Sequence, residues 1–137
     1  MNVFEDGAKY AVSGALVKVL RHRRDDRGMS VSEWASRCVT RGEVHELVTT
    51  DHSDASTGAR VDRVGFLGFA EITSAGVIDR GDEVRVDGIV IGSVLGFDCC
   101  HYPNHYNVLI HTDQPLTGVG LGLAPGSSVT FTQPEAP

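Results

Sequence analysis

Glycine divides this chain into short segments, and this spacing is the strongest constraint on its fold. The 137 residues include sixteen glycines, and the runs between them are rich in β-branched and aliphatic residues. Glycine has no Cβ atom and readily adopts the left-handed backbone of tight turns, so frequent glycines favour many turns over long helices. Asp87-Gly88, between two β-forming runs, is one of the strongest short signals for a hairpin. The pattern predicts a β-rich fold.

We predict a mainly β fold, in the form of a small antiparallel β-barrel or a barrel-like sandwich of about seven to eight strands. One short helix is expected at residues 30–38, because Ser30 and Glu33 have the spacing of a capping box. The expected strands are residues 10–20, 43–50, 64–72, 83–86, 89–91, 106–111, 118–123 and 127–131.

The length of the chain fits one folding unit. With 137 residues, 41% of them hydrophobic, the chain can form one core but is short for two domains. We expect a single domain over residues 1–132 and a flexible C-terminal tail over residues 133–137. The formal net charge of −6 argues against polyanionic partners, because a phosphate backbone or an anionic membrane surface attracts positive charge. We therefore expect neither nucleic acid nor a membrane as a partner.

Two features predict a cytoplasmic protein. No apolar stretch reaches the length of a membrane span, and residues 1–6 lack the pattern that begins a signal peptide. The chain has three cysteines, Cys38, Cys99 and Cys100, of which two are adjacent. An odd count with an adjacent pair suits reduced thiols better than a disulfide framework.

The polar and aromatic stretch at residues 98–107 is the first candidate site. It lies between two predicted strands at a bend that contains Pro103, and loops at the mouth of a barrel commonly carry binding groups. A plain hydrogen-bonded turn would explain the same residues. As a site, the stretch would supply catalytic His105 and Asp98, and ligand-binding His101, Asn104 and Asn107.

Two further candidates lie earlier in the chain. On a strand, Glu43 and His45 share a face, so the carboxylate could orient the imidazole for acid–base chemistry or ligand binding. A solvent-facing charged strand would explain the same pair. Glu71 is the only ionisable residue in the apolar run of residues 64–72. We predict that Glu71 is buried and catalytic, although a position at the end of a strand would leave it exposed.

Six histidines leave a metal site open as an alternative. A cupin-like centre could be formed by His45, His101 and His105 on neighbouring strands. The spacing of the last two does not predict a helical metal motif, because Pro103 lies between them. The adjacent cysteines have no helix N-terminus or neighbouring cation that would activate a thiol. Our main expectation is that the protein binds no metal and no organic cofactor.

The second half of the chain carries the motifs of a resemblance. Residues 64–131 resemble an uncharacterised family of small, chiefly actinobacterial proteins through Gly65-Phe66-Leu67-Gly68-Phe69-Ala70-Glu71-Ile72, Arg80-Gly81-Asp82, Gly96-Phe97-Asp98 and Pro103-Asn104-His105. This resemblance implies no activity.

The same half is more remotely similar to the sorbitol-specific enzyme IIA barrel of the sugar phosphotransferase system. The similarity lies in a Gly-Asp turn, a Phe-Asp corner and Pro125-Gly126-Ser127 before a final strand. Those proteins carry a phosphoryl group on a histidine just before a Gly-Glu-Leu-like step. The corresponding residues 68–72 contain no histidine, so the resemblance implies a similar fold rather than phosphoryl transfer.

We expect a small-molecule-binding protein that acts as a cofactor-independent isomerase or cyclase in specialised metabolism. The reason is the density of acid–base and amide groups at one bend. A non-catalytic binding or regulatory protein and a metal-dependent cupin-like enzyme are the alternatives. The expected partner is a small-molecule ligand or substrate, and a homodimer is left open.

Overall fold

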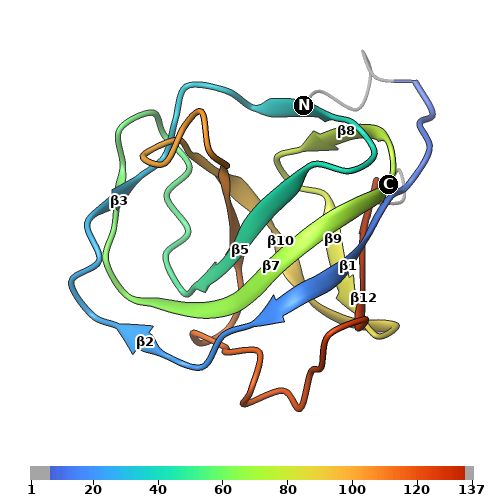
Figure 1. The fold of residues 1–137 in the computed structure, drawn as a ribbon. Coiled ribbons are helices and arrows are strands. Elements are labelled where there is room, and N and C mark those ends of the chain that lie inside the picture. Colours follow the sequence, from blue (N-terminus) through green and yellow to red (C-terminus); the bar gives the residue numbers. More distant parts are fainter. Residues whose placement is uncertain (1–6, 135–137) are drawn as a thin grey trace.

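The protein is composed of β-strands. The computed structural model describes residues 7–134, and over these residues it has strands and turns but no helix (Figure 1). The strands are β1 (Val12–Val19), β2 (Arg23–Arg24), β3 (Met29–Ser30), β4 (Ser36–Val39), β5 (Val44–Thr50), β6 (Arg60–Val61), β7 (Val64–Ser74), β8 (Gly76–Asp79), β9 (Glu83–Val86), β10 (Ile89–Asp98), β11 (Asn107–His111) and β12 (Ser128–Thr132). The predicted mainly β fold is confirmed.

Seven strands form one ring-like sheet. Their hydrogen-bonded order is β1-β12-β9-β10-β11-β5-β7, and β7 pairs again with β1. Each pairing in this ring is antiparallel except the one between β5 and β11, which is parallel. The exception places Glu46 of β5 beside Asn107 of β11. Two residues that are 61 positions apart in the sequence thus meet near the start of two neighbouring strands.

Side chains on the two faces of the ring form two apolar clusters. The first cluster receives residues from all seven strands of the ring, among them Leu16, Phe97 and Phe131. The second contains Leu109 of β11 and Met29 of β3. Alternation along β11 divides the strand between the clusters, since Val108 and Ile110 belong to the first one. Both faces of β5 and β11 are therefore covered.

The predicted helix at residues 30–38 is wrong. Residues of this segment form β3 and β4 instead, and β4 pairs with β8. The amides that would begin the helix donate elsewhere: Val31 N–H to the Ala59 carbonyl and Ser32 N–H to the Phe97 carbonyl. Val31 is also buried in the second cluster. Contacts with distant segments therefore outweigh the local capping signal.

Local turn chemistry predicted the β9–β10 hairpin correctly. Asp87 and Gly88 have φ angles of 49° and 82°, as the turn between two paired strands requires. The strand predicted at residues 118–123 is wrong, because these residues form turns in which Leu121 N–H donates to the Thr117 carbonyl.

The chain end follows β12, which stops at Thr132. Gln133 and Pro134 have no regular structure, and the rest of the predicted tail lies outside the described residues. Residues 7–134 contain no helix with the length and hydropathy of a membrane span.

Candidate functional site

The loop between β10 and β11 is folded into consecutive turns. Asn104 N–H donates to the His101 carbonyl at 2.8 Å, and His105 N–H donates to the same carbonyl at 3.2 Å. These bonds bring the two imidazole rings together, with centroids 4.9 Å apart and an interplanar angle of 26°. The bend therefore places His101 and His105 on the same side without a helix.

Asp98 anchors the base of this loop. Its carboxylate accepts hydrogen bonds from Ser30 N–H at 2.9 Å, Cys100 N–H at 3.0 Å and Asn107 Nδ2 at 3.2 Å. Burial alone would raise the pKa of Asp98, but hydrogen bonding from the Cys100 thiol and these three bonds outweigh it and lower the pKa. Asp98 and Asn107 are both buried. Neither lines the pocket described next, so Asp98 lies apart from His105, the other catalytic residue predicted in this stretch.

A pocket of about 230 Å³ lies beside the loop. It brings together the first two regions predicted from the sequence, since Glu43 and His45 line it from one segment and Asn104 and His105 from the other. The lining is completed by Tyr102, Pro103 and Tyr106, which belong to the predicted stretch of residues 98–107, and by Arg37 and Val44.

His45 is held on both sides. Its Nδ1 accepts a hydrogen bond from Tyr106 N–H at 3.2 Å, so Nε2 carries the proton and donates to Glu43 Oε1 at 3.0 Å. Burial lowers the pKa of His45 despite the neighbouring carboxylate. For Glu43, burial would raise the pKa, but hydrogen bonds from Thr40 and His45 lower it. His45 is therefore a neutral imidazole with no free ring nitrogen.

Arg37 of β4 stacks on the ring of Tyr106. The guanidinium carbon lies 3.4 Å from the ring centroid, which is a cation–π contact. The Arg37 Nε atom is buried and has no hydrogen-bond partner among the described residues. Sequence reasoning missed Arg37 because its segment was predicted to be helical. Its role depends on the pairing of β4 with β8, which has no local signal.

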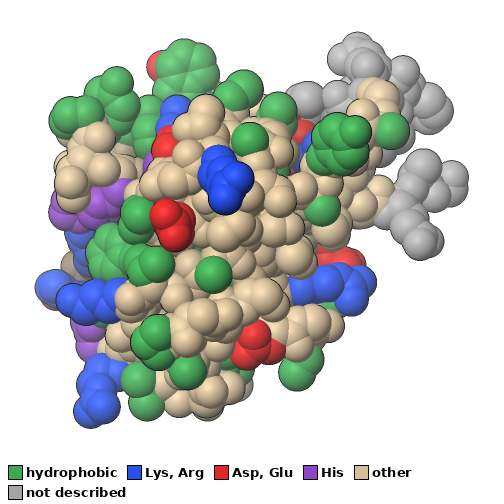
Figure 2. Space-filling model, turned by 45° about the vertical axis from the view of Figure 1, so that its right-hand side comes forward, with side chains coloured by type: hydrophobic (Ala, Val, Ile, Leu, Met, Phe, Trp, Pro, Cys, Tyr) green, Lys and Arg blue, Asp and Glu red, His purple; other side chains and the backbone are tan. Residues whose placement is uncertain are grey.

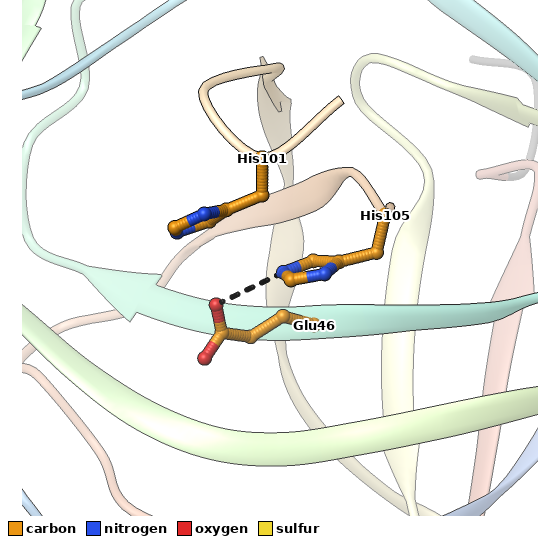
Figure 3. A group of neighbouring side chains, drawn as sticks. All are labelled: Glu46, His101 and His105. Atoms are coloured by element: carbon orange, nitrogen blue, oxygen red, sulfur yellow. Dashed lines mark ion pairs between the residues drawn. The ribbon is translucent and has the colours of Figure 1, made fainter. Parts of the chain in front are cut away.

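Three side chains meet on the other face of β5. Figure 3 shows the imidazoles of His101 and His105 on the loop, turned toward the carboxylate of Glu46 on β5. His105 Nε2 is 3.7 Å from Glu46 Oε1, and one ligand atom from each of the three residues lies within 4.8 Å of the others. Within the described part of the chain, these are the residues that could hold a metal ion.

The histidine trio predicted for a metal is corrected by this geometry. Successive side chains of a strand point to opposite faces. His45 therefore lies on the face of β5 that carries the first apolar cluster, where it lines a space with Phe97 and Val108. Glu46 takes its place beside the two loop histidines. The sequence predicts that His45 and Glu46 point to opposite faces of β5, but it does not predict which of these faces meets the loop.

Glu71 lies outside the pocket, and the prediction that it is buried is wrong. Its neighbours Ala70 and Ile72 are 1% and 2% exposed. The pleat of β7 directs every second side chain outward, and Glu71 is exposed between them. Among residues 7–134, no hydrogen bond or ion pair joins Glu71 to the loop histidines.

The cysteines are free thiols at the surface. Burial of the thiol and the adjacent Asp98 carboxylate raise the pKa of Cys100, although Arg27 opposes them. A raised pKa disfavours the thiolate, so Cys100 is a poor nucleophile.

Figure 2 shows histidine side chains at the surface along the left edge of the view, beside apolar side chains.

Comparison with known proteins identifies the family. No curated protein and no solved structure matches the chain. The resemblance to the sorbitol enzyme IIA therefore stays a prediction. One family of unknown function matches residues 6–132, which agrees with the predicted uncharacterised family. The chain belongs to this family of unknown function, DUF6917.

Proposed function

We propose that the protein binds a small organic acid in the pocket between β4, β5 and the loop. The observation that carries this proposal is the Arg37 guanidinium on the pocket wall, stacked on Tyr106. The other charged group nearby, Glu43, already accepts hydrogen bonds from Thr40 and His45. Arginine matches carboxylates by its planar array of donors, so a ligand carboxylate suits the remaining donors of Arg37.

The aromatic rings define the rest of the ligand. Tyr102 and Tyr106 both line the pocket, with their rings edge to face and centroids 5.4 Å apart. Tyr102 is 63% exposed, so its ring is available to a flat apolar group. The volume of about 230 Å³ is below that of pockets for drug-sized ligands. The proposed ligand is therefore a small acid with one ring or a short apolar body.

Binding is favoured over the isomerase or cyclase chemistry expected from the sequence. Acid–base catalysis needs a group within hydrogen-bond reach of the substrate and free to exchange a proton. In His45 both ring nitrogens are occupied, Asp98 accepts hydrogen bonds at the base of the loop, and Glu71 is exposed elsewhere. His105 lines the pocket, but its Nε2 is buried and lies toward Glu46, which is not among the residues of the pocket lining. Isomerase or cyclase activity therefore stays a prediction without a supporting contact.

Titration with benzoate tests the proposal, because this probe combines one carboxylate with one ring. Backbone amide chemical shifts in an ¹⁵N-labelled sample should change at residues 43–46, 102 and 104–106. Arg37→Gln should weaken binding by roughly tenfold or more, since a charge-assisted hydrogen bond is lost. Arg85→Gln is the matched control, because Arg85 is exposed on β9 and pairs with Glu83. Equal affinity of the two variants would refute the pocket as the binding site.

We also propose a reducing compartment for the protein, which supports the cytoplasmic location expected from the sequence. Its three cysteines are exposed and unpaired, and exposed thiols persist where disulfides are kept reduced. Mass spectrometry of protein purified without reductant measures this property. Stable disulfides within the chain would count against it.

A further inference from the structure

We propose that Glu46, His101 and His105 bind one divalent transition-metal ion, with Zn²⁺ as the reference ion. Two imidazoles and one carboxylate are the ligand types that Zn²⁺ and similar ions prefer, whereas Ca²⁺ and Mg²⁺ prefer oxygen ligands. One ligand atom of each residue lies within 4.8 Å of the others. A metal about 2.1 Å from each ligand needs only a small inward shift of the exposed His101.

The strongest support is an unsatisfied polar atom at the centre of the trio. His105 Nε2 is buried and has no hydrogen-bond partner among the described residues. The side chains of His105 and Glu46 are each 10% exposed, and their 3.7 Å separation is too long for a hydrogen bond. A buried polar atom without a partner is costly. A metal ion between the imidazole and the carboxylate would give both a partner.

The other nitrogen of His105 lies beside an amide that can support a metal-binding histidine. Asn104 Nδ2 donates to His105 Nδ1 at 3.0 Å, so Nε2 carries the proton in the metal-free protein. A half turn of this amide presents Oδ1, which accepts a hydrogen bond from Nδ1–H and leaves the Nε2 lone pair toward Glu46. In metal sites, a hydrogen bond from the ring nitrogen that does not bind the metal fixes the tautomer and orientation of the histidine. Phe69 packs edge-on against the same ring at 5.2 Å.

Arg27 contacts His101, the third residue of the group, in the metal-free protein. Its Nη2 lies 3.2 Å from His101 Nε2, and because arginine has only donors, this nitrogen must accept. The Nε2 lone pair of His101 is thus unprotonated, and it accepts a hydrogen bond from Arg27, which a metal ion could replace. A metal would displace Arg27, so the arginine competes with the metal for the site.

The site adjoins the pocket, because His105 contributes to both. Three protein ligands leave at least one coordination position for water or a ligand oxygen, as in catalytic zinc sites. The proposal does not depend on an organic acid in the pocket. Its test therefore uses the metal alone.

Isothermal titration with ZnCl₂ tests the site, using full-length protein made without a histidine tag and stripped with chelator. We expect one ion per chain, and Co²⁺ in its place should give visible absorption bands. Glu46→Gln keeps the shape of the side chain and should weaken Zn²⁺ binding by more than about tenfold, as should His105→Ala. Arg27→Ala should strengthen binding, which a purely structural arginine would not do.

His22→Ala is the matched control, because His22 is an exposed histidine that stacks on Phe66 and is not one of the three grouped residues. It should bind Zn²⁺ like the wild type. Absence of a one-to-one complex at 100 μM Zn²⁺ would overturn the proposal. So would equal affinities of the wild type and Glu46→Gln, a result that stays informative even if His105→Ala fails to fold. Benzoate binding by the metal-free protein is unaffected by either outcome.

Discussion

Two carboxylates of similar appearance in the sequence have opposite environments. Asp98 is 3% exposed and accepts three hydrogen bonds, whereas Glu71 is exposed on the outer face of β7. The sequence marks both as polar residues near apolar runs, but only the pleat decides which of them is enclosed. The same limit applies to Glu46, which sequence reasoning passed over in favour of its neighbour His45.

Removing Asp98 should destabilise the protein. Asp98→Ala leaves the amides of Ser30 and Cys100 without their acceptor. We expect the free energy of unfolding at pH 7 to fall by roughly 2–4 kcal/mol, from the loss of hydrogen bonds to a charged group. Urea denaturation measures this, with Glu71→Ala as the control that changes little. A loss for Asp98→Ala no larger than that of the control would contradict the anchoring role.

The effect of Asp98 should depend on pH with a defined sign. Its hydrogen bonds lower its pKa in the folded state. The stabilisation is therefore present above the unfolded-state pKa, near 3.9, and is lost as the pH falls through the folded-state pKa. The difference in unfolding free energy between wild type and Asp98→Ala should shrink between about pH 5 and pH 2. A difference that grows on acidification would contradict this assignment.

Among the elements, those specified by adjacent residues could be predicted and those specified by distant ones could not. The β9–β10 hairpin follows from Asp87-Gly88, whose positive φ angles are a local property. The β4 strand follows from pairing with β8, a contact between segments about 40 residues apart. Arg37 reaches the pocket only because of that pairing. The two pocket segments at residues 43–45 and 102–106 could therefore be predicted from the sequence, whereas Arg37 on β4 could not.

The segment before β1 is fastened to the turn between β8 and β9 by Lys9. Its Nζ lies 2.8 Å from Asp79 Oδ2 and 2.5 Å from Asp82 Oδ2, and Asp82 is 2% exposed. Lys9→Ala leaves these carboxylates without their cation and should lower the free energy of unfolding by about 3 kcal/mol. Lys18→Ala is the control, because Lys18 is exposed on β1. Equal denaturation midpoints for the two variants would argue against the fastening.

At the scale of the whole molecule, the pairing of β1 with β7 completes the ring, and glycine permits it. Gly68 of β7 lies opposite Val19 with a φ angle of 151°. A Cβ atom at Gly68 would lie 2.1 Å from the Lys18 carbonyl oxygen. On the other strand, a Cβ atom at Gly14 would lie 2.8 Å from the Glu71 carbonyl oxygen. Both strands of this seam therefore depend on a residue without a side chain.

Gly68→Ala should open the seam, because the added Cβ atom would meet the Lys18 backbone while β5 holds β7 on its other side. We expect the free energy of unfolding to fall by roughly 2–4 kcal/mol, combining overpacking with an unfavourable backbone conformation. Hydrogen exchange should accelerate more at the β1 amides than in the β9–β10 hairpin, which is paired independently of β7. Gly7→Ala is the control, since a Cβ atom there meets nothing within 4 Å. If Gly68→Ala were as stable as this control, with unchanged protection along β1, closure of the ring would not depend on the close approach at Gly68.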